Sequence, residues 1–195
     1  MAKRKDTDDV YVCIVALTNR HQTEEEATVR KLEMDKAHSL LGVKDSYILT
    51  HESGYLDLEP MYELVGHLEE VIRTEDFTEI YIPARCHMHD HSIVNDACIA
   101  ALRPGNPRPP FIAEYEHNWP GWSSVEGGTG YCVLTKKEVE LKLAALECFS
   151  SQLGRHKHVP RHPLSSEATL QILEMRGYEC GAKYAERFKI MYAEL

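Results

Sequence analysis

The sequence predicts an α/β protein with a doubly wound, mostly parallel sheet flanked by helices. Short apolar runs rich in β-formers alternate with longer segments of helical periodicity. The first run, residues 10–17, is almost continuously hydrophobic, which is typical of a parallel strand covered on both faces. With 195 residues, 43% of them hydrophobic and 27% charged, the chain is long enough for one well-packed domain. We expect that domain to span residues 1–195.

The first half of the chain alternates strands and helices. Thr23 and Glu26 have the spacing of a capping box at the start of a helix, and Gly42 marks its end. Two further strands are predicted at 46–50 and 79–83, and two further helices at 58–73 and 92–102. In a doubly wound sheet, function collects at loops beyond the carboxyl ends of the strands. The loop at residues 84–91 occupies such a place.

The second half is less regular. The proline-rich segment 103–110 predicts a connector, followed by a strand at 111–115. A long helix is predicted at 136–153, and a basic loop at 155–163. Two helical pieces, at 165–176 and 181–192, are expected on either side of Gly177.

Charge and cysteine usage limit the class of protein. The net charge of −9 argues against a dedicated nucleic-acid binder. Residues 1–9 do not resemble a signal peptide, because no apolar run follows their positive charges. We expect these residues to be disordered. The longest apolar run is far below the roughly 20 residues that cross a bilayer. The six cysteines form no CxxC pair and are expected to be reduced, in a cytoplasmic protein.

Three histidines at alternate positions, His87, His89 and His91, lie in the loop after the strand at 79–83, with Asp90 beside them. Imidazole and carboxylate groups are ligands that zinc accepts in proteins, so this cluster is a candidate metal site. A solvated polar loop is the alternative. The motif of metallo-β-lactamase-like enzymes is a poorer match, because the spacing here is one residue short.

Several further segments share order and spacing with one enzyme family. The chain resembles the LmbE/PIG-L family of zinc-dependent N-deacetylases over nearly its whole length. The matching segments are Ala16-Leu17-Thr18-Asn19; Arg30, Glu33, Ala37 and Leu41-Gly42-Val43; Ile80-Tyr81-Ile82-Pro83, Asp90-His91 and Ala97; Lys142, Ala145-Leu146 and Ser151-Gln152; and Arg176-Gly177, Gly181 and Tyr184-Ala185-Glu186-Arg187-Phe188.

The resemblance implies a Rossmann-like fold and a Zn²⁺-dependent hydrolase that removes an N-acetyl group from an amino sugar or related glycoconjugate. It implies His91 as the metal ligand, Asp90 as the group that orients a neighbouring imidazole, and Arg30 as a substrate contact. Met88 stands where the family's His-Pro-Asp-His motif begins, so the role of that first histidine would pass to His87 or His89.

The family's opening strand and its His-Pro-Asp-Asp-Glu motif, which supply two metal ligands and the general base, have no counterpart in these 195 residues. The resemblance therefore predicts an N-terminally incomplete domain. Its remaining ligands would come from a missing segment or a complementing chain, and an exposed sheet edge would favour a partner chain or a homo-oligomer.

Two other hypotheses stay open: a catalytically inactive binding or scaffolding relative, and an unrelated metal-binding protein that uses the histidine cluster. Aromatic residues near a glycine-rich segment could line a sugar site, although such residues serve cores more often. They are Tyr115, Trp119 and Trp122. A basic cluster could bind an anionic group, with a solvated loop as the alternative. It consists of Arg155, His156, Lys157, His158, Arg161 and His162.

Overall fold

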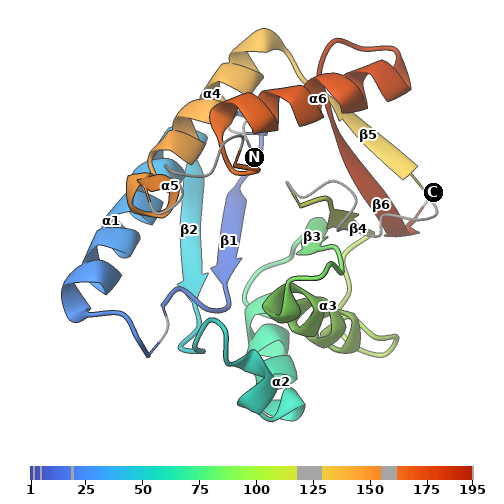
Figure 1. Ribbon diagram of the computed structural model, residues 1–195. Coiled ribbons are helices and arrows are strands. Elements are labelled where there is room, and N and C mark those ends of the chain that lie inside the picture. Colours follow the sequence, from blue (N-terminus) through green and yellow to red (C-terminus); the bar gives the residue numbers. More distant parts are fainter. Residues whose placement is uncertain (2, 5, 19, 118–128, 155–161, 195) are drawn as a thin grey trace. The chain divides into compact units, whose positions relative to one another are not determined.

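The computed structural model describes the chain except for residues 2, 5, 19, 118–128, 155–161 and 195 (Figure 1). It is a mixed α/β fold, which confirms the predicted class. Within the described residues, no helix is both long and apolar enough to span a bilayer. The chain divides into two compact units. Unit 1 comprises Met1–Thr50 and Cys132–Glu186, and unit 2 comprises His51–Tyr131 and Arg187–Leu195.

Unit 1 begins with two parallel strands. β1 (Val10–Ile14) and β2 (Val43–Ile48) form a two-stranded sheet, and α1 (Glu24–Leu41) connects them. Ahead of β1, the backbone N–H of Arg4 donates to Met1 O at 2.9 Å, so this segment contains a turn. The parallel pairing across an intervening helix is the β-α-β arrangement that the sequence predicts.

Both ends of α1 are set by the predicted capping residues. The Thr23 side chain accepts the backbone N–H of Glu26, and the Glu26 carboxylate accepts the N–H of Thr23 at 2.9 Å. At the other end Gly42 adopts a left-handed conformation with φ of 66°, which glycine reaches without steric cost. These bonds satisfy backbone groups that a helix end otherwise leaves unpaired.

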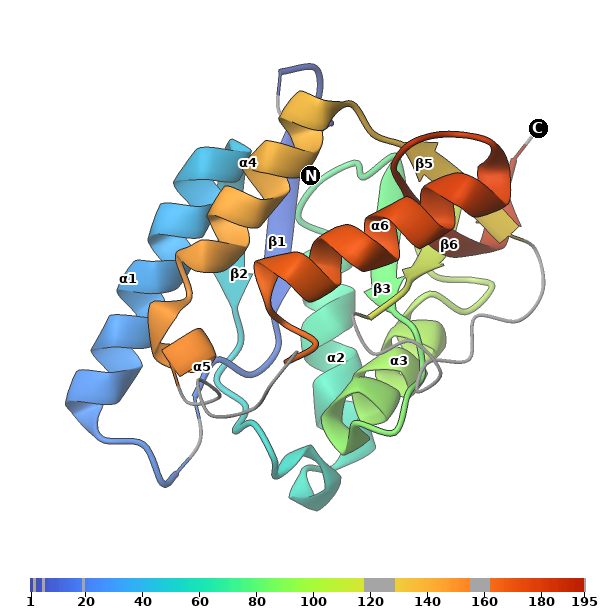
Figure 2. The same cartoon turned by 45° about the horizontal axis from the view of Figure 1, so that its top comes forward.

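The single helix predicted at 136–153 is two helices in the structure, α4 (Lys136–Glu147) and α5 (Ser150–Gly154). The carboxylate of Glu33 on α1 explains the break. It accepts hydrogen bonds from the hydroxyls of Ser150 and Ser151 and from the backbone N–H of Ser151, at 2.7–2.9 Å. These bonds hold the first residues of α5 against α1, and α4 packs along α1 (Figure 2).

Unit 2 contains a short 3-10 helix, η1 (Leu56–Leu58), and most of a four-stranded sheet of order β3-β4-β6-β5. β3 and β4 pair in parallel, whereas β6 runs antiparallel to β4. α2 and α3 pack against each other, and α3 also packs on β3. The bounds are α2 (Met61–Ile72), β3 (Glu79–Pro83), α3 (His89–Ala101), β4 (Phe111–Tyr115), β5 (Thr129–Val133) and β6 (Ala185–Ala193).

The prediction of a helix at 181–192 is wrong, because β6 occupies this segment. Its sequence alternates polar and apolar residues, with Phe188, Ile190 and Tyr192 at every second position. That period fits a strand, and aromatic and β-branched residues favour one. Pairing with β4 places Phe188 beside Tyr115 and supplies the ladder that a local pattern cannot reveal.

Gly177 was expected to separate two helical pieces, yet α6 (Ser166–Cys180) runs through it. A side chain at this position would meet the returning chain, since an added Cβ lies 2.6 Å from the backbone carbonyl carbon of Lys183. Gly177 therefore serves a close backbone approach and does not end the helix. The helix ends at Gly181, whose φ is 75°.

Candidate functional site

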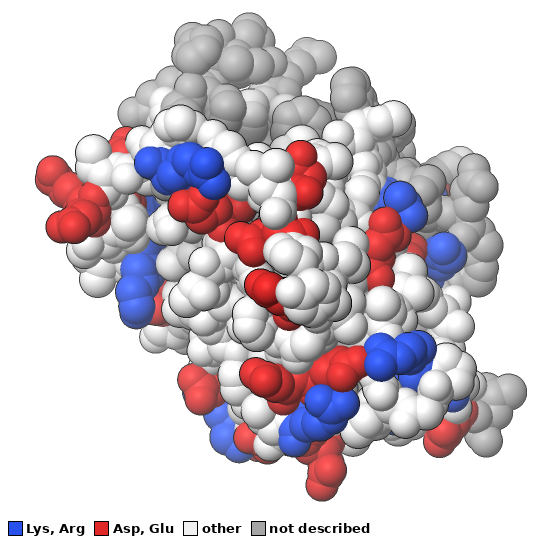
Figure 3. Space-filling view, turned by 90° about the horizontal axis from the view of Figure 1, so that it is seen from below, with Lys and Arg blue, Asp and Glu red and all other residues white. Residues whose placement is uncertain are grey.

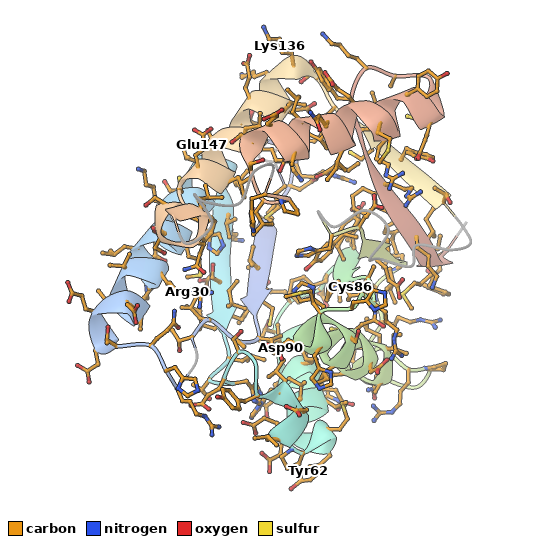
Figure 4. The ribbon with its side chains drawn as sticks, in the orientation of Figure 1. Arg30, Tyr62, Cys86, Asp90, Lys136 and Glu147 are labelled. Atoms are coloured by element: carbon orange, nitrogen blue, oxygen red, sulfur yellow. The ribbon has the colours of Figure 1, made fainter. Side chains whose placement is uncertain are left out.

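The candidate site lies where β3 passes into α3, within unit 2. Residues 84–88 form the connection, and His89, Asp90 and His91 form the first turn of α3, so these three residues are helical and not part of the predicted loop. Figure 4 shows Cys86 and Asp90 at this junction. Met88 is the N-cap and makes no side-chain cap bond, whereas Asp90 places a carboxylate at the positive end of the helix dipole.

Asp90 bonds to a neighbouring loop. Its Oδ2 accepts the backbone N–H of Gly54 at 2.5 Å and the hydroxyl of Ser53 at 3.3 Å. The other oxygen, Oδ1, is buried, and nothing in the described part of the chain forms a hydrogen bond with it. The hydrogen bonds of Asp90 within the described residues thus go to Ser53 and Gly54, and its role in orienting an imidazole stays a prediction. Asp90 therefore holds the loop that contains Ser53 and Gly54, and its Oδ1 is a buried acceptor to which no described residue donates.

His91 is half-buried between two side chains that the sequence prediction did not include. Its Nδ1 lies 3.3 Å from the Sγ of Cys86, and its ring packs on His117 with 4.4 Å between centroids. Burial lowers the pKa of His91, and the negative charge of Asp90 opposes this shift. Burial, assisted by the nearby His91, also lowers the pKa of His117 to about 4. Both imidazoles are therefore neutral near neutral pH.

The other two histidines of the cluster are exposed, whereas His91 is half-buried. His89 is 68% exposed, and its Nε2 lies 3.7 Å from Oδ2 of Asp57. His87 is exposed on the connection before α3. The alternation along the sequence suggested one shared site, but the start of α3 turns successive side chains in different directions around the helix axis.

A second pair of histidines supports the loop that Asp90 holds. His51 is buried, and its Nε2 lies 3.0 Å from the Nδ1 of His67 on α2. Gly54, three residues further, has a φ of 82°, and its N–H points to Asp90. The loop at 51–55 is thus attached to α2 at one end and to α3 at the other. No local pattern in the sequence singled out this loop.

Asn95 fixes α3 on the sheet behind the site. It is fully buried, and its Nδ2 donates to Pro83 O at 2.8 Å and to Glu114 Oε1 at 3.0 Å. Glu114 is also buried and lies 3.4 Å from the ammonium group of Lys189. Burying this carboxylate requires such partners, so the three side chains form a structural support for the first turn of α3.

The predicted substrate residue Arg30 belongs to unit 1, whereas the histidines belong to unit 2. Arg30 lies on α1, and its guanidinium donates to Gln22 Oε1 at 3.3 Å. Lys142 and Glu186, two other family-matched residues, form an ion pair with each other.

The described side chains do not assemble a complete metal site. Within that part of the chain, no group of three or more His, Cys, Asp or Glu residues is arranged to hold an ion. An open catalytic zinc site normally has three protein ligands. The described residues thus do not fit a complete zinc site, although His91 and its neighbours supply ligand types that zinc accepts.

A shallow surface groove of about 670 Å³ lies on α2 and shares no residue with the Asp90–His91 segment. Its lining includes the exposed Met61 and Tyr62, and the ion-paired Glu69 and Arg103. Tyr62 is labelled in Figure 4. On the face shown in Figure 3, acidic and basic side chains are interspersed.

Some predicted residues lie outside the described part of the chain. These are Trp119, Trp122 and most of the basic cluster, namely Arg155, His156, Lys157, His158 and Arg161. Tyr115, the remaining aromatic residue of the proposed sugar site, is 38% exposed at the end of β4. Within the cluster, His162 is described, and its Nδ1 accepts the N–H of Leu164.

No protein-family profile and no curated protein matches the sequence. Solved structures do match. N,N'-diacetylchitobiose deacetylase from Pyrococcus horikoshii is 24% identical with a TM-score of 0.72, and covers 97% of this chain and 76% of its own. The zinc-inhibited form of teicoplanin deacetylase Orf2 is 14% identical with a TM-score of 0.75, and covers 97% and 90%.

A hydratase has the same fold. The 4-carboxy-2-hydroxymuconate hydratase GalB from Pseudomonas putida KT2440 is 16% identical with a TM-score of 0.66, over 96% of this chain and 85% of its own. At these identities the likeness establishes the fold and not the reaction. The predicted resemblance is confirmed at that level: this chain has the fold of LmbE/PIG-L-type deacetylases.

Proposed function

We propose that this protein is a hydrolase that removes an N-acetyl group from an amino sugar or a related glycoconjugate. The observation that carries the proposal is the Asp90-His91 pair in the first turn of α3, at the carboxyl end of β3, in a fold shared with deacetylases. In open α/β sheets, ligands bind beyond the carboxyl ends of the strands. The pair also combines a buried spare carboxylate oxygen with a neutral imidazole.

The chain's own residues would act as follows. Asp90 would orient a neighbouring imidazole and stabilise its positive charge, since its carboxylate acts electrostatically on His91. His87 or His89 would donate to the amide carbonyl oxygen, in place of the histidine that the family has at the position of Met88. Arg30 would contact the substrate, which rests on the family pattern alone.

A divalent metal, zinc by resemblance, belongs to the proposal with His91 as a ligand. A zinc ion would polarise the amide carbonyl and activate water. The described residues do not complete its coordination. The other ligands would have to come from polypeptide outside the described residues, whether an additional segment or a complementing chain.

The open alternatives differ in what they predict. A binding or scaffolding relative would show neither stoichiometric zinc nor turnover. A metal protein that uses all three clustered histidines would hold zinc through His87 and His89 as well. The position of His89 beside Asp57 does not favour a metal site that uses all three histidines.

The experiment measures zinc by elemental analysis and acetate release from N,N'-diacetylchitobiose, with and without added zinc. We expect His91→Ala to lose both. His38→Ala is the matched control, because His38 is bonded to Ser46 in unit 1. Equal zinc content in the two variants would refute His91 as the ligand, and a zinc-loaded protein without acetate release would refute the deacetylase.

A further inference from the structure

The exposed face of α2 combines apolar and charged side chains that the proposed function does not use. Tyr62 is 73% exposed and Met61 is 42% exposed, so this face presents an aromatic ring and a thioether to solvent. Adjacent exposed apolar side chains with a polar rim are typical of interaction sites. The groove on this face belongs to unit 2 alone. Its lining consists of Met61, Tyr62, Val65, Gly66, Glu69 and Arg103.

The amino-terminal end of the groove is aromatic. The hydroxyl of Tyr62 donates to Glu63 Oε1 at 3.0 Å, which satisfies the polar end of this side chain. The ring itself stays exposed and offers its negative π face to a partner. One turn further along α2, Gly66 leaves the middle of the groove open, because a Cβ added there meets no atom of the described chain within 4 Å. A second helix can therefore cross α2 at this point.

The carboxyl-terminal end of the groove is cationic. The carboxylate of Glu69 accepts hydrogen bonds from Arg103 at 2.6 Å, Arg73 at 3.0 Å and the amide of Asn106 at 2.8 Å. This network contains two guanidinium groups and one carboxylate, so it carries a net positive charge. The side chains of Arg103 and Arg73 are 54% and 48% exposed. A guanidinium group is attracted to the face of an aromatic ring within about 6 Å of it.

The two ends of the groove are complementary to each other and lie at similar distances from its middle. Tyr62 lies four residues before Gly66, and Glu69, which holds Arg103, lies three residues after it, so each end is about one helical turn away. Under a two-fold rotation about a point near Gly66, the aromatic end of one groove meets the cationic end of an identical groove. A self-complementary surface of this kind is what an isologous dimer requires.

We propose that α2 binds a second copy of this chain in an antiparallel crossing near Gly66, with Tyr62 of one copy over Arg103 of the other. The symmetry produces this contact twice. Tyrosine, methionine and arginine, which line the groove, are enriched at protein–protein interfaces. The dimer does not depend on the proposed deacetylase reaction, because the groove shares no residue with the Asp90–His91 segment.

Sedimentation velocity over a concentration series measures the association of the wild type. One helix face is a small interface, in the class that buries less than about 1,200 Å², so we expect a reversible dimer with a Kd of about 10–100 μM. Protein concentrations up to about 1 mM cover this range of affinity. A wild-type chain that stays monomeric throughout the series overturns the proposal.

Tyr62→Ala tests the aromatic contact. Because the interface is isologous, one substitution removes the contact twice, and we expect the Kd to rise by about 100-fold. The variant should therefore remain monomeric over the same series. Tyr178→Ala is the matched control, since Tyr178 is a tyrosine on α6 in unit 1 that is 89% exposed. It should leave the dimer unchanged. A dimer that survives Tyr62→Ala, such as one formed through a sheet edge, overturns the proposal.

Complementation between two variants tests the pairing itself. Tyr62→Lys sets a cation against Arg103, and Arg103→Glu removes the cation that Tyr62 meets, so each variant alone should be monomeric. In an equimolar mixture, the introduced ammonium group faces the introduced carboxylate at one contact, and Tyr62 faces Arg103 at the other. The mixture should therefore recover the dimer.

Circular dichroism shows whether the variants of this mixture are folded. A mixture of folded variants that stays monomeric overturns the pairing of Tyr62 with Arg103. Arg103→Glu also loses the bond to Glu69. If this variant fails to fold, the comparison of Tyr62→Ala with Tyr178→Ala decides, because both tyrosines are exposed and their replacement leaves the core intact.

Discussion

The carboxylate of Asp90 is an electrostatic as well as a structural partner of His91. Its charge raises the pKa of the imidazole, against the larger lowering by burial. We therefore predict that Asp90→Asn lowers the pKa of His91 further. NMR titration of the ring protons in the metal-free protein measures it. Asp96→Asn is the control on the same helix, since that carboxylate is paired with Arg85. An unchanged or higher pKa in Asp90→Asn would contradict the assigned coupling.

The pKa of Glu33, in unit 1, is also set by its neighbours. The direction of this shift determines how the stability of the fold depends on pH. Burial raises its pKa, but hydrogen bonds from Ser151 and Ser150 and the charge of Arg30 outweigh this effect, so the pKa is lowered on balance. A carboxyl group with a lowered folded-state pKa stabilises the fold above its unfolded pKa of about 4.3. The contribution disappears as the pH falls through the folded-state pKa.

We predict that Glu33→Gln costs about 2 kcal/mol at neutral pH, the scale of hydrogen bonds to a charged group. The difference from the wild type should shrink as the pH falls below about 4. Urea unfolding at several pH values measures it. Glu25→Gln, an exposed change on the same helix, should have little effect at any pH. A loss for Glu33→Gln that is independent of pH would show that packing and not charge is responsible.

At the scale of elements, replacing either of two helical glycines by alanine should change the stability in opposite directions. An added Cβ at Gly177 in α6 would lie 2.6 Å from the backbone of Lys183, whereas one at Gly66 in α2 has no neighbour within 4 Å. Gly177→Ala should destabilise the protein by about 1–3 kcal/mol through overlap. Gly66→Ala should stabilise it by up to about 1 kcal/mol through helix propensity. Thermal unfolding compares the two, and equal effects would contradict the close approach.

Features that depend on residues close together in the sequence could be predicted, and features that depend on distant residues could not. The ends of α1 were predictable because Thr23, Glu26 and Gly42 act within one turn. β6 was not, because it needs β4 as a partner, and the paired residues Tyr115 and Phe188 are far apart in the chain. The site shows the same contrast. Asp90 and His91 were chosen from a contiguous motif, whereas their contacts with Gly54 and His117 are made only by the fold.

At the scale of the whole molecule, the chain passes between the two units inside strands. The boundary after Glu186 falls within β6, and the boundary after Tyr131 falls within β5. The first residues of β6 are anchored in unit 1, where Ala185 is fully buried and Glu186 pairs with Lys142. Its later residues pair with β4 in unit 2. Releasing one end of such a strand weakens the ladder at the other.

We therefore predict that the two units unfold together, although each has its own internal packing. Gly177→Ala, a change within unit 1, should lower the protection of β4 amides in unit 2 by the same free energy as those of α1. Hydrogen exchange followed by mass spectrometry under native conditions resolves the two segments. Gly66→Ala serves as the control with the opposite expected sign. If β4 kept its wild-type protection in Gly177→Ala while α1 lost its own, the shared strands would not couple the units.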